Sequence, residues 1–165
     1  MAILTLSEID DLCQELLVPQ PNYNSQIIDY FRNMYATGCR PAELFDVSKW
    51  SYDGVSMFEL QPLKGNLPRY FNASVLTSYF KDTIINNGTL YPFTTLRKQR
   101  YYNQKFRSVP QVFNLGKEVE NYLFRYRYVK QLAEDGEDNL TITAIMGWND
   151  STIVNLYKFA NLYTP

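Results

Sequence analysis

The sequence predicts a mainly helical domain with one small three-stranded antiparallel sheet, an α+β fold. Apolar residues recur at helical spacing over most of the chain, whereas short strand-like runs bounded by turn residues gather between about residues 50 and 72. The length of 165 residues and the 45% content of hydrophobic residues suit one globular domain with a substantial core. We see no internal repeat and no interdomain linker, so we expect a single domain.

Three helices are expected before the sheet. The first runs from Ser7 to about Leu17 and has acidic residues in its first turn, where the helix dipole favours them. The second is capped by Asn24 or Ser25 and stops at Gly38, because glycine adopts the left-handed conformation that commonly follows a helix end. The third is short, from Pro41 to about Val47, since proline suits the first turn of a helix.

The sheet is expected next. Met57–Gln61 and Leu67–Phe71 read as two strands of a hairpin whose turn is Lys64–Asn66. Pro68 lacks a backbone N–H, which places its strand at an edge of the sheet. Asp53-Gly54 indicates another turn, so that a further strand before it completes the three.

The remaining chain is expected to be helical. Helices are predicted at about 74–86, 93–106, 117–134, 139–146 and 151–161. Turn residues such as glycine and proline separate them.

Arg40 stands in the turn between the second and third helices, within the segment Thr37–Leu44. Its guanidinium is a permanent cation with a planar fork of donors. Such a cation in a helix–helix turn is either tied to a carboxylate such as that of Glu43 or directed at an anion from outside. The sequence leaves these two alternatives open.

Charge is distributed unevenly along the chain. The formal net charge is −1, which argues weakly against a nucleic-acid-binding protein. Residues 97–130, however, hold nine basic residues and two acidic ones, and a phosphate backbone responds to local potential. We expect Arg97, Lys98, Arg100 and Arg127 to be candidates for DNA-backbone contact, although a solvated helix face explains the basic run Arg97–Arg100 about as well.

Residues that are missing also limit the function. The chain has no histidine and two cysteines, which argues against a zinc site of the usual kind and removes the side chain that most often carries protons near neutral pH. No apolar run is long enough to cross a membrane, and the first residues lack the basic start of a secretory signal. We therefore expect an intracellular, reduced protein with no membrane association.

Four further candidates each have an ordinary structural explanation when they are taken singly. Arg125 lies with Tyr122 on a largely apolar helix face, where an arginine usually snorkels or pairs with an acid. Lys64 suits a solvated hairpin turn. Trp148 suits a core anchor, and Tyr157 suits a packing position on the last helix.

In their order and spacing, however, these residues resemble the catalytic domain of the tyrosine recombinases, the phage-integrase family. That family places its first arginine in a T-G-x-R-x-x-E-L turn, a lysine on a β-hairpin, a second arginine in H-x-x-R, and G-[HW] nine residues before a nucleophilic tyrosine. The matching residues here are Thr37–Leu44, Lys64, Tyr122–Arg125, Gly147-Trp148 and Tyr157. The opening Leu4–Ile9 is also similar to the usual start of that domain, so the resemblance covers essentially the whole chain.

The resemblance implies a site-specific DNA recombinase or integrase, an enzyme that cuts and rejoins DNA through a 3′-phosphotyrosyl intermediate and needs no cofactor. Two arginines would clamp the non-bridging phosphate oxygens, and an indole N–H would serve one more. A lysine would protonate the leaving 5′-oxygen, a tyrosine would attack, and an acid would support the arginine turn. On this resemblance, Arg40 and Arg125 would be the two arginines and Trp148 would supply the indole. Lys64 would be the proton donor, Tyr157 the nucleophile, and Glu43 the supporting acid.

Tyr122 departs from the family pattern, because it stands where the family usually has histidine. Tyrosine can hydrogen-bond a phosphate oxygen, but with an ordinary pKa of about 10 it is a poor general base near neutral pH. Two alternatives therefore stay open. One is a degenerate relative that binds DNA without cutting it, and the other is an unrelated helical domain.

The resemblance also sets expectations for organisation and partners. Residues 1–165 would form a single catalytic domain without the family's N-terminal core-binding domain. The partner would be double-stranded DNA, with a monomer in solution and a tetrameric synapse on DNA. The protein would act in DNA recombination or integration for a mobile genetic element, in the cytoplasm or nucleoid of a prokaryotic host or wherever the host DNA resides.

Overall fold

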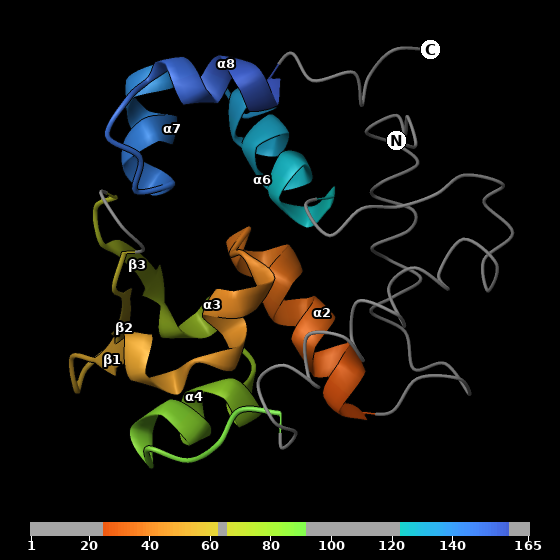
Figure 1. Ribbon diagram of the computed structural model, residues 1–165, viewed down its shortest axis with the longest axis vertical. Helices are drawn as coiled ribbons and strands as arrows, with labels where there is room; N and C mark the ends of the chain where they lie inside the picture. Colours follow the sequence, from red (N-terminus) through yellow and green to blue (C-terminus); the bar gives the residue numbers. More distant parts are fainter. Residues whose placement is uncertain (1–24, 63–65, 92–122, 159–165) are drawn as a thin grey trace, which may run out of the picture.

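The computed structural model describes residues 25–62, 66–91 and 123–158 (Figure 1). Its elements are, in order, α2 (Ser25–Thr37), α3 (Pro41–Phe45), η1 (Val47–Lys49), β1 (Trp50–Tyr52), β2 (Met57–Leu60), β3 (Arg69–Asn72), η2 (Ala73–Val75), α4 (Ser78–Ile85), α6 (Leu123–Glu134), α7 (Asn139–Ile145) and α8 (Thr152–Lys158). The helices expected at 7–17 and 93–106, and the first part of the one expected at 117–134, lie outside the described residues.

The sheet is three-stranded and antiparallel in the order β1-β2-β3, as predicted. Trp50 pairs with Leu60, and Phe58 pairs with Phe71, which fixes the register. β3 follows Pro68 and lies at an edge, so this prediction is also confirmed. Alternate residues of β3 are buried and exposed, as expected for a strand with one face on the core.

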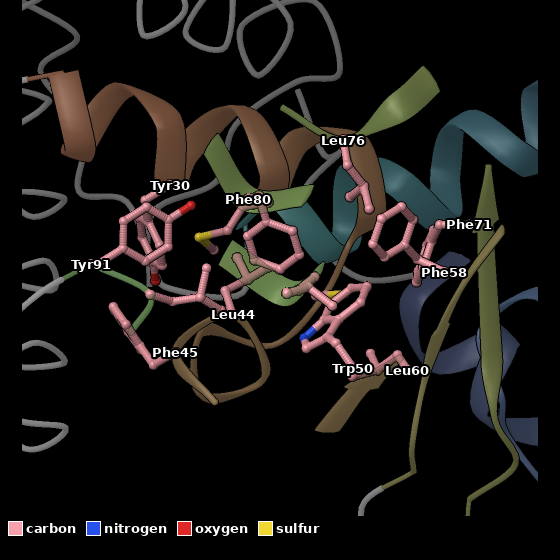
Figure 2. Close-up of a cluster of buried hydrophobic side chains, with 14 of the residues drawn as sticks. Tyr30, Leu44, Phe45, Trp50, Phe58, Leu60, Phe71, Leu76, Phe80 and Tyr91 are labelled. Carbon is pink, nitrogen blue, oxygen red and sulfur yellow. The ribbon is translucent and has the colours of Figure 1, made fainter. Parts of the chain in front are cut away.

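The larger core lies between the sheet and α2, α3 and α4 (Figures 1 and 2). Trp50 of β1 is central to it, because its ring meets Phe80 of α4 edge-on at 4.9 Å and Phe71 of β3 at 5.7 Å. On the other side, Tyr30 of α2 stacks on Phe45 of α3 at 5.1 Å. Aromatic rings packed in this way contribute both buried apolar area and favourable edge contacts.

A second, smaller cluster lies among α6, α7 and α8, at the opposite end of the molecule in Figure 1. Its buried members are Val129, Ile142, Met146, Trp148 and Val154. α6 also packs against α2, and Phe124 of α6 belongs to the larger core. α6 therefore connects the two clusters.

Element boundaries differ from the predictions where a local cap intervenes. The helix expected at 74–86 divides into η2 and α4, because Thr77 lies between them in extended backbone and its side chain accepts from the Phe80 N–H. The short third helix ends at Phe45 rather than Val47, since Asp46 turns out of the helix and caps η1. In the described residues, no helix combines the length and the apolarity that crossing a membrane requires.

Candidate functional site

The turn between α2 and α3 has the backbone that its sequence predicts. Gly38 has a φ of +62°, and its N–H donates to the Met34 carbonyl at 2.9 Å, which closes α2. A Cβ at this position would lie 2.7 Å from the ring of Tyr128, so glycine is required both by conformation and by the approach of α6. Arg40 then takes the position before the first residue of α3, Pro41.

Glu43 supports this turn through the main chain. It is 6% exposed, and its carboxylate accepts the Arg40 backbone N–H at 2.8 Å. Its own carbonyl accepts the indole N–H of Trp50 at 2.7 Å, which ties α3 to the sheet. The Arg40 guanidinium itself makes no hydrogen bond or ion pair with any residue of the chain that the structure describes. Of the two alternatives for Arg40, pairing with Glu43 is therefore not observed.

Arg125 lies in the first half of α6 and does not snorkel, contrary to the structural explanation that its helix face suggests. It is 4% exposed, and its Nη1 donates to the Gly38 carbonyl at 2.9 Å. Its guanidinium carbon lies 5.5 Å from the ring of Trp148. The turn that presents Arg40 thus also holds Arg125, because Gly38 stands two residues before Arg40.

Arg40 and Arg125, far apart in sequence, line one small pocket between the two clusters. The wall also includes Glu43, Arg69 and Met146, together with residues at the end of β2 and around the hairpin: Leu60, Gln61, Pro62, Asn66 and Leu67. The lining of this pocket holds three guanidinium groups and one carboxylate, a set of charges that suits an anion with several oxygen acceptors. We call it the arginine pocket.

Arg69 is the member of the arginine pocket that sequence reasoning missed. It is 5% exposed and occupies the first position of β3. A signal was present, because Arg69 and Phe71 share the inward face of a strand by the two-residue period. An arginine on the core face of a strand is rarely buried without hydrogen-bonding partners, which marks it as a residue with a specific role.

Trp148 packs in the second cluster at 2% exposure and does not line the arginine pocket. The residue before it, Gly147, has a φ of +69°, and its carbonyl accepts the Leu67 N–H at 2.7 Å. A Cβ at Gly147 would lie 2.4 Å from the Leu67 carbonyl oxygen. The Gly-Trp pair therefore lets the hairpin approach the end of α7 closely and places an indole ring beside Arg125.

Other predicted site residues can be placed in part. Tyr157 belongs to α8, which packs against α6, the helix that carries Arg125, but its side chain lies outside the described part of the chain. Arg127 lies apart from the arginine pocket, with its Nη2 donating to the Tyr35 hydroxyl at 2.6 Å and its guanidinium carbon 4.0 Å from that ring. The predicted residues outside the described ranges are Lys64, Arg97, Lys98, Arg100 and Tyr122.

Cys39 lies beside the arginine pocket, and its buried side chain is only 1% exposed. Burial raises the pKa of its thiol to about 11, outweighing the opposing effect of Arg69. Its sulfur lies 3.6 Å from Nη1 of Arg69. The thiol therefore stays neutral near pH 7, so that the cationic charge of the pocket is not reduced by a thiolate.

Comparisons with solved structures identify the fold. The chain matches XerA recombinase with a TM-score of 0.68 and 18% identity over 95% of this chain and 60% of that one. It matches XerH site-specific recombinase bound to palindromic difH substrate with a TM-score of 0.65 and 13% identity over 94% and 48%. It matches the Tn1549 transposon integrase in complex with transposon right end DNA with a TM-score of 0.60 and 17% identity over 96% and 61%.

The fold is therefore that of tyrosine recombinase catalytic domains, as the sequence resemblance predicts. The chain spans between 48% and 61% of the lengths of these three structures. No protein-family model matches the chain, and no curated protein matches it in sequence.

Proposed function

We propose that this chain is a DNA strand-transfer domain of the tyrosine recombinase type, which cuts and rejoins double-stranded DNA through a 3′-phosphotyrosyl intermediate. The observation that carries the proposal is the arginine pocket, in which Arg40 and Arg125 meet although the fold brings them from distant parts of the sequence. The shared fold and the DNA present in two of the matched structures support it.

In the proposed reaction, the two arginines bind the non-bridging oxygens of the scissile phosphate. Arg40 is suited to this role because its guanidinium is not engaged by the described residues, and Arg125 is held in place by Gly38 and Trp148. Charge-assisted, forked donors lower the energy of the transition state more than that of the ground state, because negative charge grows on those oxygens.

The chemical step would be carried by Tyr157 as the nucleophile and Lys64 as the proton donor. The phenol oxygen of Tyr157 would release its proton to solvent and attack phosphorus, forming the bond to the 3′-phosphate. The bond to the 5′-oxygen would break, with Lys64 supplying the proton to that oxygen. The phosphotyrosine linkage conserves the energy of the broken phosphodiester bond. Attack by a 5′-hydroxyl can therefore reverse the step and reseal the strand. Trp148 would act by positioning Arg125, as its burial indicates.

The second candidate is a relative that binds DNA without cutting it. Tyr122 in the place of the usual histidine favours it, and so does the absence of any histidine from the chain that could replace it. In this case the arginine pocket would bind a phosphate of the DNA backbone, and no covalent product would form.

Covalent trapping distinguishes the two. DNA sequences that the full chain binds would first be enriched from a random duplex pool, and the enriched sequence would then be prepared with nicks at successive positions. A nick beside the cleavage point lets the short product dissociate, so the enzyme stays attached. We expect wild type to give a denaturant-resistant, protease-sensitive adduct, Tyr157→Phe to give none, and Arg40→Ala to form it roughly 10²–10³-fold more slowly.

Tyr70→Phe is the matched control, because Tyr70 is 61% exposed on β3 and should trap like wild type. DNA binding without an adduct at any nick position would favour the non-cutting relative. An adduct that persists in Tyr157→Phe would mean that another tyrosine attacks, and failure to enrich any bound DNA would contradict both candidates.

A further inference from the structure

Arg69 is a buried cation in the wall of the arginine pocket, and its two hydrogen bonds to oxygen atoms go to carbonyls of residues that do not line the pocket. Its Nε donates to the Ile145 carbonyl at 2.9 Å, and its Nη2 donates to the Thr37 carbonyl at 2.6 Å. Its guanidinium carbon lies 4.8 Å from the ring centre of Phe71 and 5.9 Å from that of Tyr128. Hydrogen bonds thus hold the edge of the guanidinium, and aromatic rings lie against its plane.

The two carbonyls that Arg69 contacts lie at the C-terminal ends of two helices. Thr37 is the last residue of α2, and Ile145 is the last residue of α7. The last carbonyls of a helix have no partner within the helix, and they carry the negative end of its dipole. One guanidinium therefore caps two helix ends that belong to different clusters of the core. A guanidinium has separate donor nitrogens that can reach two carbonyls at once, here Nε and Nη2. The ammonium of a lysine has one nitrogen and cannot span both carbonyls.

Each capped helix end leads directly into the site. After Thr37 the chain passes through Gly38, whose carbonyl holds Arg125, to Arg40. After Ile145 it passes through Gly147 to Trp148, whose ring lies 5.5 Å from the Arg125 guanidinium. Arg69 is therefore attached to the two main-chain segments that determine where Arg40 and Arg125 lie.

We propose that Arg69 is a positioning residue of the arginine pocket: by capping α2 and α7 with one guanidinium, it fixes Arg40 and Arg125 relative to each other. The proposal rests on the proposed function for the identity of the anion, but the capping itself is independent of catalysis. It differs from a role in which Arg69 binds the anion as a third positive charge. A lysine would largely keep that charge but could not cap both helices.

The first test needs no variant. In the wild-type chain, through-hydrogen-bond NMR coupling should connect Arg69 Nε with the carbonyl carbon of Ile145, and the Nε proton should exchange slowly with solvent. Rapid exchange and absence of the coupling in the folded protein would overturn the proposal.

The second test compares Arg69→Lys with wild type by amide hydrogen exchange. The Gly38 and Trp148 amides, which close α2 and α7, should exchange about tenfold faster in the variant, because opening of the helix ends becomes easier. The Phe80 amide in α4 should not change. Arg32→Lys, an exposed change on α2, serves as the control and should leave all three amides as in wild type. Wild-type exchange at both helix ends in Arg69→Lys would contradict the capping role.

The third test uses the enriched, nicked DNA. At saturating DNA, Arg69→Lys should form the covalent adduct about tenfold more slowly while its DNA affinity stays close to that of wild type, because misplacement of catalytic groups affects the chemical step. A wild-type rate in Arg69→Lys would show that charge alone is needed and would overturn the proposal. If wild type itself forms no adduct, the proposed function fails, and the NMR and exchange measurements still decide whether Arg69 positions the pocket.

Discussion

At the scale of single residues, the site depends on main-chain positions as much as on charged side chains. Gly38 and Gly147 both have positive φ, and both allow a neighbouring segment to approach closer than a Cβ would permit. At Gly38 the neighbour is Tyr128 of α6, and at Gly147 it is the carbonyl of Leu67. Each glycine stands within two residues of a predicted site residue, so its backbone conformation helps to set where that residue lies.

Substitution of Gly147 should therefore be costly. In Gly147→Ala, the new Cβ would lie 2.4 Å from the Leu67 carbonyl oxygen, and the backbone would keep a left-handed conformation that alanine disfavours. We expect the free energy of unfolding to fall by about 2 kcal/mol or more, measured by urea denaturation.

Gly136→Ala provides the comparison, because Gly136 also has a positive φ, of +91°, but a methyl group added there would meet no described atom within 4 Å. In Gly136→Ala, the free energy of unfolding should fall only by the cost of the left-handed backbone, about 1–2 kcal/mol. Equal losses in the two variants would mean that the hairpin is not packed against Gly147 as the structure shows.

The resemblance to the tyrosine recombinases selects Arg40, Glu43 and Arg125 as candidates, and the structure brings all three to one pocket. The contacts that each of them makes could not be predicted from the sequence. That Arg125 would be buried against the Gly38 carbonyl could not be predicted, because the contact joins α6 to the end of α2. Arg69 was missed for the same reason, since both carbonyls it caps are distant in sequence.

At the scale of elements, short capping contacts set where helices begin. Thr77 caps α4, and Asp138 caps α7 by accepting the Thr141 N–H at 2.8 Å. Such caps satisfy backbone donors that a helix start leaves without partners. They explain why the helix expected at 74–86 is divided and why α7 begins at Asn139. The type of each described α-helix and β-strand was predictable, but the limits of these elements and the two 3-10 helices η1 and η2 depended on individual side chains.

The cap of α7 should make stability depend on pH. Hydrogen bonding from the Thr141 backbone holds the pKa of the Asp138 carboxyl below its usual value of 3.8. A carboxyl whose pKa is lower in the folded state stabilises the fold above its unfolded pKa, and this contribution is lost as pH falls through the folded pKa. Asp138→Asn keeps a capping oxygen that does not titrate.

We therefore expect the difference in melting temperature between wild type and Asp138→Asn to be constant near neutral pH and to move in favour of the variant below about pH 4. Asp138→Ala should melt lower than both near neutral pH, because the cap is removed. Thermal unfolding followed by circular dichroism across this range measures all three. A pH-independent difference between wild type and Asp138→Asn would show that the carboxylate does not cap α7.

At the scale of the whole molecule, the arginine pocket lies between two hydrophobic clusters. Arg69, α6 and the contact of Leu67 with Gly147 connect the sheet and α2–α4 with α6–α8. The sequence predicted a single domain and its sheet, since periodicity reports which face of each element is buried. It could not predict the division of the core into two clusters, because that depends on how the elements pack.

Because these connections are several, we expect the two clusters to unfold together. Trp50 lies in the larger cluster and Trp148 in the smaller, and the chain has no other tryptophan. In Trp50→Phe and Trp148→Phe, the remaining indole reports on one cluster at a time. Their fluorescence transitions should each coincide with the transition that circular dichroism records for the same variant.

Phe80→Ala tests the same coupling from one side. Phe80 is fully buried in the larger cluster, so its removal should cost about 3–5 kcal/mol. In that background both tryptophans should report the lower stability. A transition of Trp148 that stays at its original denaturant concentration would show that the clusters are independent.

Because the arginine pocket lies between the clusters, its lining residues come from both halves of the chain. A fragment ending before Leu123 would keep the sheet and Arg40 but lose Arg125, and a fragment starting there would hold Arg125 without the Gly38 carbonyl that orients it. Neither piece would contain the complete arginine pocket. If the protein is split at that point, the pocket should form again only when the two halves reassociate, so any anion binding that depends on it should return only then.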